Sequence, residues 1–222
     1  MGIITLKKSN HLFWLGRYIE RVYTTLKYYI KGVDKMIDKN PNYYAEYYEK
    51  IGILDIYGSK EKFKKIYAFS EEDSNSIISN LNRAYDNAIV MRDYIGTETM
   101  AYVQLVIDDV KVAERGSSPI TDLMLALDHI LAFWGCVDDL IDDEVIRNII
   151  KLGKGIERLD LYLSFEIKAS EIEREYKRMK QYLSKSHIRN DVGVINSIDS
   201  MLNSHELNYN IVRNLIRNLI LE

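Results

Sequence analysis

The stretch Leu15-Gly16-Arg17-Tyr18-Ile19-Glu20-Arg21 returns near the other end of the chain as Leu152-Gly153-Lys154-Gly155-Ile156-Glu157-Arg158. Each residue of the second copy lies 137 positions after its equivalent, since 152 − 15 = 137. Both copies share Leu-Gly at the start and Ile-Glu-Arg at the end, and each has a basic residue four positions before the arginine. The repeat predicts two equivalent structural units within one chain.

Both copies lie in a helical pattern of apolar residues, which recur at alternating spacings of three and four. Around the first copy they are Leu12, Leu15, Ile19, Val22, Leu26, Tyr29, Val33 and Met36. Around the second they are Ile149, Leu152, Ile156, Leu159 and Leu163. This spacing places them on one face of a long α-helix. The match ends where Glu166 takes the position equivalent to Tyr29.

The charged residues of the repeat need partners outside their own helix. Glu20 and Arg21 are adjacent, so their side chains point about 100° apart and cannot pair well with each other. We expect each glutamate to pair across an approximate two-fold axis: Glu20 with Arg158 or Lys154, and Glu157 with Arg21 or Arg17. The alternative is that these are solvated surface charges, each pair contributing about 0–1 kcal/mol.

Length and composition predict one all-α domain over residues 1–222. The chain is 47% hydrophobic, which provides a substantial core, and only 2 prolines and 11 glycines interrupt it. No segment alternates with period two, so we expect no sheet. The prediction is a bundle of about six main helices, with a core at about 9–185 and short C-terminal helices at about 190–222.

Net charge and cysteine content indicate which binding partners and which cellular compartment to expect. The net charge of −3 gives no overall preference for nucleic acid or anionic membrane. Cys136 is the only cysteine, which excludes an internal disulfide and suits a reducing compartment. The first eight residues lack a signal-peptide pattern, and no run approaches about 18 consecutive apolar residues. We therefore expect a cytoplasmic protein that spans no membrane.

The helix boundaries follow from caps and breaks. We expect the first helix from Ser9 or Asn10 to about Lys39, because either residue is a good N-cap. We expect short helices within 43–57 and another short helix that ends at about 67. A further helix should begin at Ser70, and the chain from there to about 115 should form one kinked helix or two. After the break before Pro119 come a helix beginning at Pro119, a long helix at about 142–184, and short helices at 192–203 and 206–221.

A second polar set lies on the middle helix, at Asn87, Arg92, Asp93 and Glu98. Asn87 is unfavourable in a helix interior, which suggests a buried hydrogen bond. Combined with Arg17, Glu20, Arg21, Glu157 and Arg158, this set could line a polar interior that binds an anionic or peptide-like ligand. It could equally form a structural ion-pair network, which we favour over a catalytic one.

A metal or cofactor site is not expected. Asp138, Asp139 and Asp142 spell the DDxxD pattern that all-α isoprenoid synthases use for magnesium, but a second acidic site is missing because Asp108-Asp109 has no acid one turn on. We favour an acidic helix N-terminus there, since the helix dipole stabilises it. The four histidines show no zinc spacing, and no Glu-x-x-His occurs for a di-iron site.

The segment from Leu12 to Arg21 resembles the opening of the bacterial alpha-E domain family, a helical family named for its Glu-Arg motif. Further stretches agree in order: Asn87-Ala88, Arg92-Asp93, Thr97-Glu98, Asp143-Glu144 and the second Glu-Arg segment as far as Asp160. Asp160 therefore joins the candidate cluster. The chain departs from the expected pattern at Ile89, Met100 and Lys154, where we would expect a basic residue, Trp and Arg.

The resemblance implies a partner. Members of the family are commonly encoded beside ATP-grasp ligases, transglutaminase-like proteins and proteasome-like peptidases, which suggests peptide modification. Our first hypothesis is an accessory protein of an ATP-grasp amide-bond-forming enzyme, with a homo-oligomer as an open alternative for its assembly. The second is a stand-alone enzyme that acts on a peptide or acyl substrate through the Glu-Arg cluster. The third is a magnesium-dependent diphosphate enzyme.

Overall fold

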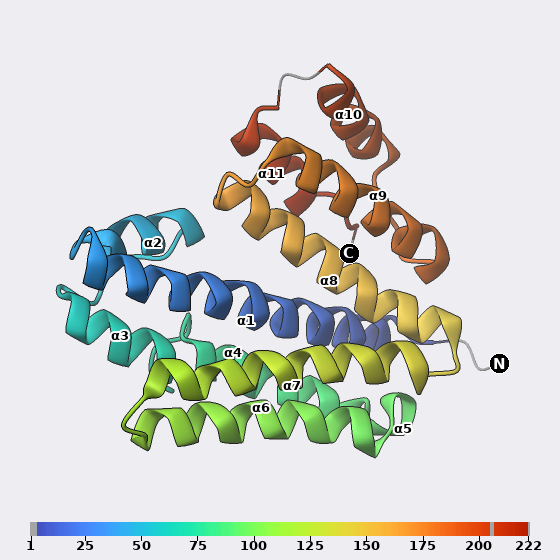
Figure 1. The fold of residues 1–222 in the computed structure, drawn as a ribbon. Coiled ribbons are helices and arrows are strands. Elements are labelled where there is room, and N and C mark those ends of the chain that lie inside the picture. Colours follow the sequence, from blue (N-terminus) through green and yellow to red (C-terminus); the bar gives the residue numbers. More distant parts are fainter. Residues whose placement is uncertain (1–3, 205–206, 222) are drawn as a thin grey trace.

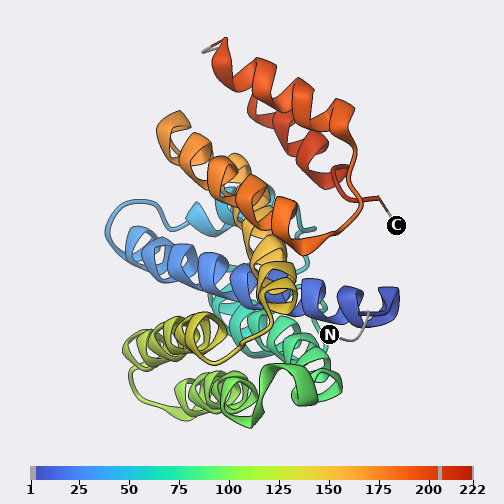
Figure 2. The same ribbon diagram turned by 90° about the vertical axis from the view of Figure 1, so that its right-hand side faces the viewer.

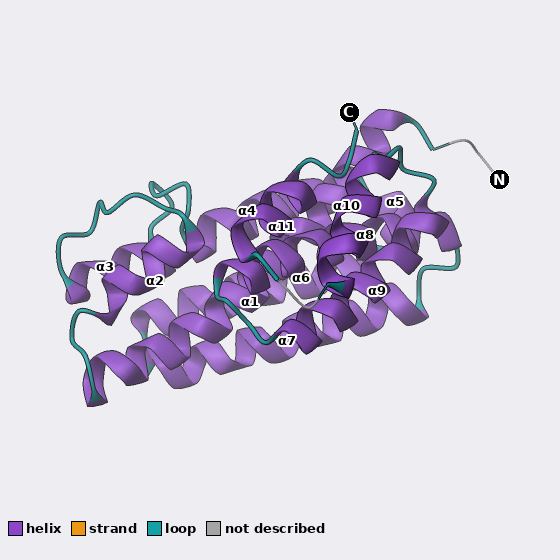
Figure 3. Cartoon of the chain, turned by 90° about the horizontal axis from the view of Figure 1, so that it is seen from above, coloured by secondary structure: helices purple, strands orange, loops and turns teal. Residues whose placement is uncertain are grey.

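The two copies of the repeat lie on two helices that cross, α1 (Leu6–Asp38) and α8 (Glu144–Ser164). The computed structural model describes residues 4–204 and 207–221, and within these ranges it has eleven helices and no strand (Figures 1 and 3). The only β-type pairing there is an isolated bridge between Asn190 and Ile220. The predicted all-α helical bundle is therefore confirmed.

Burial explains why the repeat sets the fold. All eight apolar positions predicted for α1 are buried, and so are all five predicted for α8. These two faces pack against each other at the centre of the molecule. The first helix begins earlier than expected, at Leu6, because the side chain of Thr5 caps it by accepting from the backbone N–H of Lys8 at 3.4 Å.

On one side of α1 lie α4 (Ile77–Val90), α5 (Arg92–Ile95), α6 (Thr97–Arg115) and α7 (Pro119–Asp139), as Figures 1 and 2 show. The middle region that we expected to be one kinked helix or two is divided into α4, α5 and α6. Its last break falls at Gly96, whose φ of 82° favours glycine.

The predicted helix start at Ser70 is wrong. α4 begins at Ile77 after Ser76, whose side chain accepts from the N–H of Ser79. Asp73 serves the preceding loop instead, because it is buried and accepts a hydrogen bond from the hydroxyl of Tyr57 at 2.8 Å. A tertiary contact has thus overridden a local helix-start pattern.

On the other side of α1 lie α8, α9 (Ala169–Ser186), α10 (Val192–Asn203) and α11 (Tyr209–Arg217) (Figure 2). The single helix expected at 142–184 is therefore wrong, since the chain turns back between α8 and α9. The turn includes Glu166 at a φ of 53°, the position where the repeat pattern ends. Beside it Phe165 stacks on Tyr28, with ring centroids 4.2 Å apart.

The tyrosine-rich segment forms part of the core rather than a free surface. It comprises α2 (Tyr43–Ile51) and the loop to α3 (Lys60–Phe69). Tyr47, Tyr57 and Phe63 are fully buried or nearly so and pack edge to face. The hydroxyl of Tyr47 donates to the carbonyl oxygen of Thr25 on α1 at 2.7 Å. Tyr47 and Tyr57 thus bury their apolar rings while each hydroxyl keeps a hydrogen-bond partner.

One described helix, α7, is long and apolar enough to cross a membrane by length and composition. Its apolar window has a mean hydropathy of 1.5, and 33% of that window is buried inside the protein. Asp122 and Asp128 interrupt its sequence, so α7 contains no long unbroken run of apolar residues. Its inward face packs on α6, and its outward face exposes Met124, Leu125 and Leu131.

Candidate functional site

The crossing of α1 and α8 depends on two glycines. A Cβ atom on Gly16 would overlap the carbonyl oxygen of Ile150, and one on Gly153 would overlap the carbonyl oxygen of Phe13. The two backbones therefore touch directly at the centre of the site, where any larger residue would hold them apart. Close contact at this point brings the charged residues one turn further along each helix within reach of the opposite helix.

Glu20 is fully buried and paired with Arg158. Nε and Nη2 of Arg158 donate to the two carboxylate oxygens of Glu20 at 2.7 and 2.8 Å. Thr24 adds a further hydrogen bond at 2.8 Å. The predicted pairing across the repeat is therefore confirmed, in the bidentate geometry that gives Arg–carboxylate pairs their strength.

Glu157 repeats this arrangement from α8. It is also fully buried, and it accepts from Arg17 at 2.8 Å and from Arg21 at 2.6 Å. The second predicted pairing is therefore confirmed as well. Burial acts to lower the pKa of Arg21, but the attraction and hydrogen bond of Glu157 more than offset it and raise that pKa.

The two-fold relation breaks at Lys154, which is equivalent to Arg17. Because Arg158 occupies both oxygens of Glu20, no described ion pair joins Lys154 to that carboxylate. Its ammonium lies 3.9 Å from the centroid of the Trp134 ring instead. Burial lowers the pKa of Lys154 to about 8, although the negative charge of Glu20 acts in the opposite direction.

Each half of the cluster extends to a further helix that the sequence pattern did not indicate. On one side Asp160, which is 4% exposed, accepts from Arg213 at 3.0 Å and from Arg217 at 2.7 Å, both on α11. Burial acts to raise the pKa of Asp160, but the two arginines lower it below its ordinary value. On the other side Glu175 of α9 lies 3.4 Å from Arg158. The i,i+4 spacing of Arg213 and Arg217 is the signal that could have found them.

The middle-helix set lies elsewhere. Arg92, Asp93 and Glu98 are exposed around α5, and Arg92 donates to Thr97 at 3.3 Å. Their predicted place in the polar interior is therefore wrong, because α4 ends at Val90 and the chain turns before reaching them. Asn87 does find a partner: its side-chain oxygen lies 2.8 Å from Nδ1 of His11.

Among the described residues no group of three or more His, Cys, Asp and Glu is placed to hold a metal ion. Asp138 pairs with Lys151 at 2.6 Å, while Asp139 and Asp142 are exposed. Next to them Asp143 caps α8 by accepting from two backbone N–H groups. The interpretation as an acidic helix N-terminus therefore holds for Asp143 and Glu144 at the start of α8. It is wrong for Asp138 and Asp139, which are the last two residues of α7.

A cavity of about 1040 Å³ adjoins the Glu157 side of the cluster. It lies where the first turns of α1, the start of α8 and the end of α11 meet, and both Arg17 and Arg217 line it. The volume is at the upper end of the range of small-molecule sites in proteins, and the lining combines apolar residues with a few charges, as such sites do.

The fold and the site together define a class: an all-α protein whose two central helices are joined by reciprocal, buried Glu–Arg pairs. A family model described as a predicted alpha-helical domain with a conserved ER motif matches residues 7–206. The chain belongs to this family, Alpha-E. No curated protein and no solved structure is detectably similar to the chain.

Proposed function

We propose that this chain is an accessory protein of an ATP-grasp amide-bond-forming system, in which the Glu–Arg cluster is structural. The observation that carries the structural role is the occupancy of both central carboxylates. Each oxygen of Glu20 and of Glu157 accepts from an arginine, and neither side chain is exposed. A general base needs a carboxylate within reach of a substrate proton.

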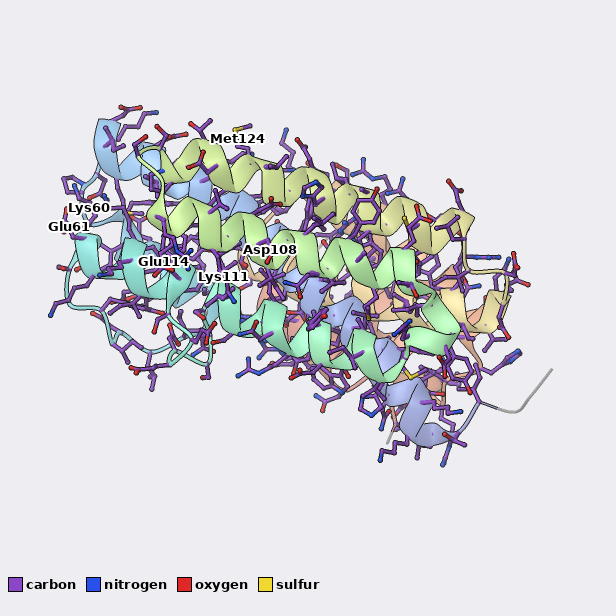
Figure 4. All side chains as sticks on the ribbon, turned by 90° about the horizontal axis from the view of Figure 1, so that it is seen from below. Lys60, Glu61, Asp108, Lys111, Glu114 and Met124 are labelled. Atoms are coloured by element: carbon purple, nitrogen blue, oxygen red, sulfur yellow. The ribbon has the colours of Figure 1, made fainter. Side chains whose placement is uncertain are left out.

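The outward face of α7 supports a protein partner. Met124, Leu125 and Leu131 are 55%, 51% and 52% exposed and lie on one side of the helix. Figure 4 shows α6 beside α7, with Asp108 and Lys111 on its surface. A bilayer around α7 would have to accommodate those charges at a high cost. We therefore assign this face to the ATP-grasp partner rather than to lipid, in keeping with a cytoplasmic protein.

The identity of the partner and the link to peptide modification rest on the proteins that the family resemblance implies are encoded beside this one. The alternative is a stand-alone enzyme that acts on a peptide or acyl substrate through the same cluster. That alternative requires Glu20 or Glu157 to leave its arginine partner. It predicts activity of the purified chain that Glu20→Gln abolishes while the fold is retained.

The test is co-purification with the ATP-grasp protein encoded beside this chain. We expect a stable complex whose ligase activity depends on the chain. Leu131→Lys should weaken the complex, whereas Leu54→Lys, at a side chain that is 83% exposed on the loop after α2, should not. Gel filtration of the chain alone separates this result from self-association through α7. Full ligase activity without the chain would refute the proposal.

A further inference from the structure

The cavity beside the Glu157 half of the cluster has an apolar interior. Its lining includes Phe13 and Trp14 of α1, Ile149 and Ile156 of α8, and Ile216 and Ile220 near the C-terminus. Four of the six are buried to at least nine-tenths within the protein, so the walls are fixed by the core itself. Such walls favour an apolar chain over a fully solvated ligand.

Two arginines are held rigidly at the edge of this cavity. Nε and Nη2 of Arg17 both contact Glu157, each at 2.8 Å, and its guanidinium lies 4.7 Å from the Trp14 ring centroid. Nε and Nη2 of Arg217 contact Asp160 at 2.7 and 3.1 Å. Each arginine thus keeps its Nη1 group uncommitted within the described chain. Their side chains are already ordered, so ligand binding costs little additional side-chain entropy.

A third arginine lines the same cavity and has no acidic partner within the part of the chain that the structure describes. Arg189 is exposed, and no described carboxylate pairs with its side chain. Its backbone is fixed, since its carbonyl oxygen accepts from the N–H of Leu221 at 3.1 Å. His187, at a φ of 57°, turns the chain out of α9 and directs this loop toward the cavity.

The charges around the cavity do not cancel. Among the described residues, the charged groups that line the cavity and the groups ion-paired to them, directly or through a shared carboxylate, are five arginines and three carboxylates. These leave an excess of 5 − 3 = 2 positive charges: Arg17, Arg21, Arg189, Arg213 and Arg217, against Asp143, Glu157 and Asp160. A protein that is negative overall therefore concentrates positive charge at one concave site. Such a site attracts an anion, and planar guanidinium groups suit a carboxylate in particular.

We propose that this cavity binds an apolar chain that ends in a carboxylate, with the carboxylate between Arg189, Arg17 and Arg217 and the apolar part along Phe13, Trp14 and Ile149. A fatty acid and a peptide with a free C-terminus share this chemistry. The inference goes beyond the accessory role and does not depend on it, because the purified chain alone is sufficient to test it.

The chain offers its own reporter for binding. Of its two tryptophans, Trp14 lines the cavity at 37% exposure, whereas Trp134 is 5% exposed and lies outside it. In a Trp134→Phe background, a ligand in the cavity should change the emission of Trp14 and protect it from quenching by acrylamide. We would titrate dodecanoate against dodecanol, and an acetylated apolar tripeptide acid against its amide.

We expect at least one of the two acids to saturate the signal, with its uncharged counterpart at least about tenfold weaker. Binding of dodecanoate alone identifies an acyl chain, and binding of the peptide acid identifies a C-terminus. Equal binding of the acid and its uncharged counterpart, or no binding of either acid, would overturn the proposal.

Arg189→Ala supplies the decisive variant, because Arg189 has no ion-pair partner among the described residues whose loss would disturb the fold. We expect it to weaken binding at least about tenfold while the thermal melt is unchanged. Arg115→Ala, at an exposed arginine on α6 far from the cavity in the sequence and outside its lining, should bind normally. Normal binding by Arg189→Ala would refute the assigned carboxylate position. Either result leaves the co-purification test of the accessory role unaffected.

Discussion

Gly16 and Gly153 hold equivalent places in the crossing of α1 and α8, and each lies against the backbone of the other helix in the same way. The carbonyl oxygen that bounds Gly16 belongs to Ile150, and the one that bounds Gly153 belongs to Phe13. These two residues are themselves 137 positions apart, since 150 − 13 = 137. The repeat in sequence is therefore a two-fold relation in space.

Replacing Gly153 with alanine should destabilise the protein by about 2–3 kcal/mol, because the new methyl group overlaps a backbone carbonyl that cannot move independently. Urea denaturation measures the change. Gly135→Ala is the matched control within a helix, since no described atom beyond its chain neighbours and the nearby backbone of its own helix lies within 4 Å of its Cβ position. That control should stabilise by roughly 0.5–1 kcal/mol through helix propensity. Equal effects at both sites would contradict direct backbone contact at the crossing.

The pair of Glu20 and Arg158 should show strong coupling in a double-mutant cycle. Either single change removes the main partner of a buried charge, leaving Glu20 without its arginine or Arg158 with only Glu175 at 3.4 Å, and should cost about 3–5 kcal/mol. The double replacement should cost less than the sum of the singles by more than about 1 kcal/mol. The cycle on Lys180 and Asp199, which are 38% and 37% exposed at 2.8 Å, provides the comparison. We expect at most about 1 kcal/mol of coupling there, and a similar value for both pairs would argue against a buried network.

The reciprocal Glu–Arg pairs could be predicted from two features of the sequence, the helical period and the repeat. The helical period places Glu20 and Arg21 on different faces, and the repeat supplies an equivalent helix with the opposite need. The packing of α1 on α8 follows from the same apolar positions. Neither step requires knowledge of the remaining helices.

The errors arise where distant contacts decide the outcome. The turn between α8 and α9 has no glycine or proline, and Phe165 is drawn out of the helix by its stacking on Tyr28. The contacts of Arg213 and Arg217 with Asp160 join residues more than 50 positions apart. Conversely, Arg92 and Asp93 were expected to continue the helix that contains Asn87, but the turn at Met91 ends that helix before them. Local pattern alone does not encode these events.

Asp160→Asn should loosen α11. Asp160 is 4% exposed and binds two arginines of that helix, so the loss of its charge should cost about 2–3 kcal/mol at pH 7. Hydrogen exchange should show the increase first in the amides of α11, because this helix contacts the rest of the fold mainly through α8. Exchange that rises equally in α4 would instead indicate a global effect.

The ion pairs of Asp160 should also make the stability of the protein depend on pH in the acid range. The pKa of Asp160 is lowered in the folded state, so the unfolded chain binds the proton more readily. The stabilisation is therefore present above the ordinary value of 3.8 and is lost as the pH falls below it. The difference in unfolding free energy between the wild type and Asp160→Asn should shrink in that range. A difference that stays constant down to the lowest pH at which the protein folds would contradict the assigned pairing.

Lys154→Met should stabilise the protein at neutral pH. The pKa of Lys154 is lowered from 10.5 to about 8, so between these values the unfolded chain binds more protons than the folded chain, and stability rises with pH. Below pH 8 the folded protein bears the full cost of the buried ammonium, with an upper limit of roughly 3 kcal/mol. Methionine keeps the hydrocarbon on Trp134 without the charge, so we expect a gain of about 1–3 kcal/mol at pH 7 that disappears toward pH 10.5. Urea denaturation at both pH values measures it, and Lys62→Met, at an exposed lysine of α3, should show no such pH dependence. A loss of stability at pH 7 would mean that the attraction of the ammonium to the Trp134 face and to Glu20 outweighs its burial.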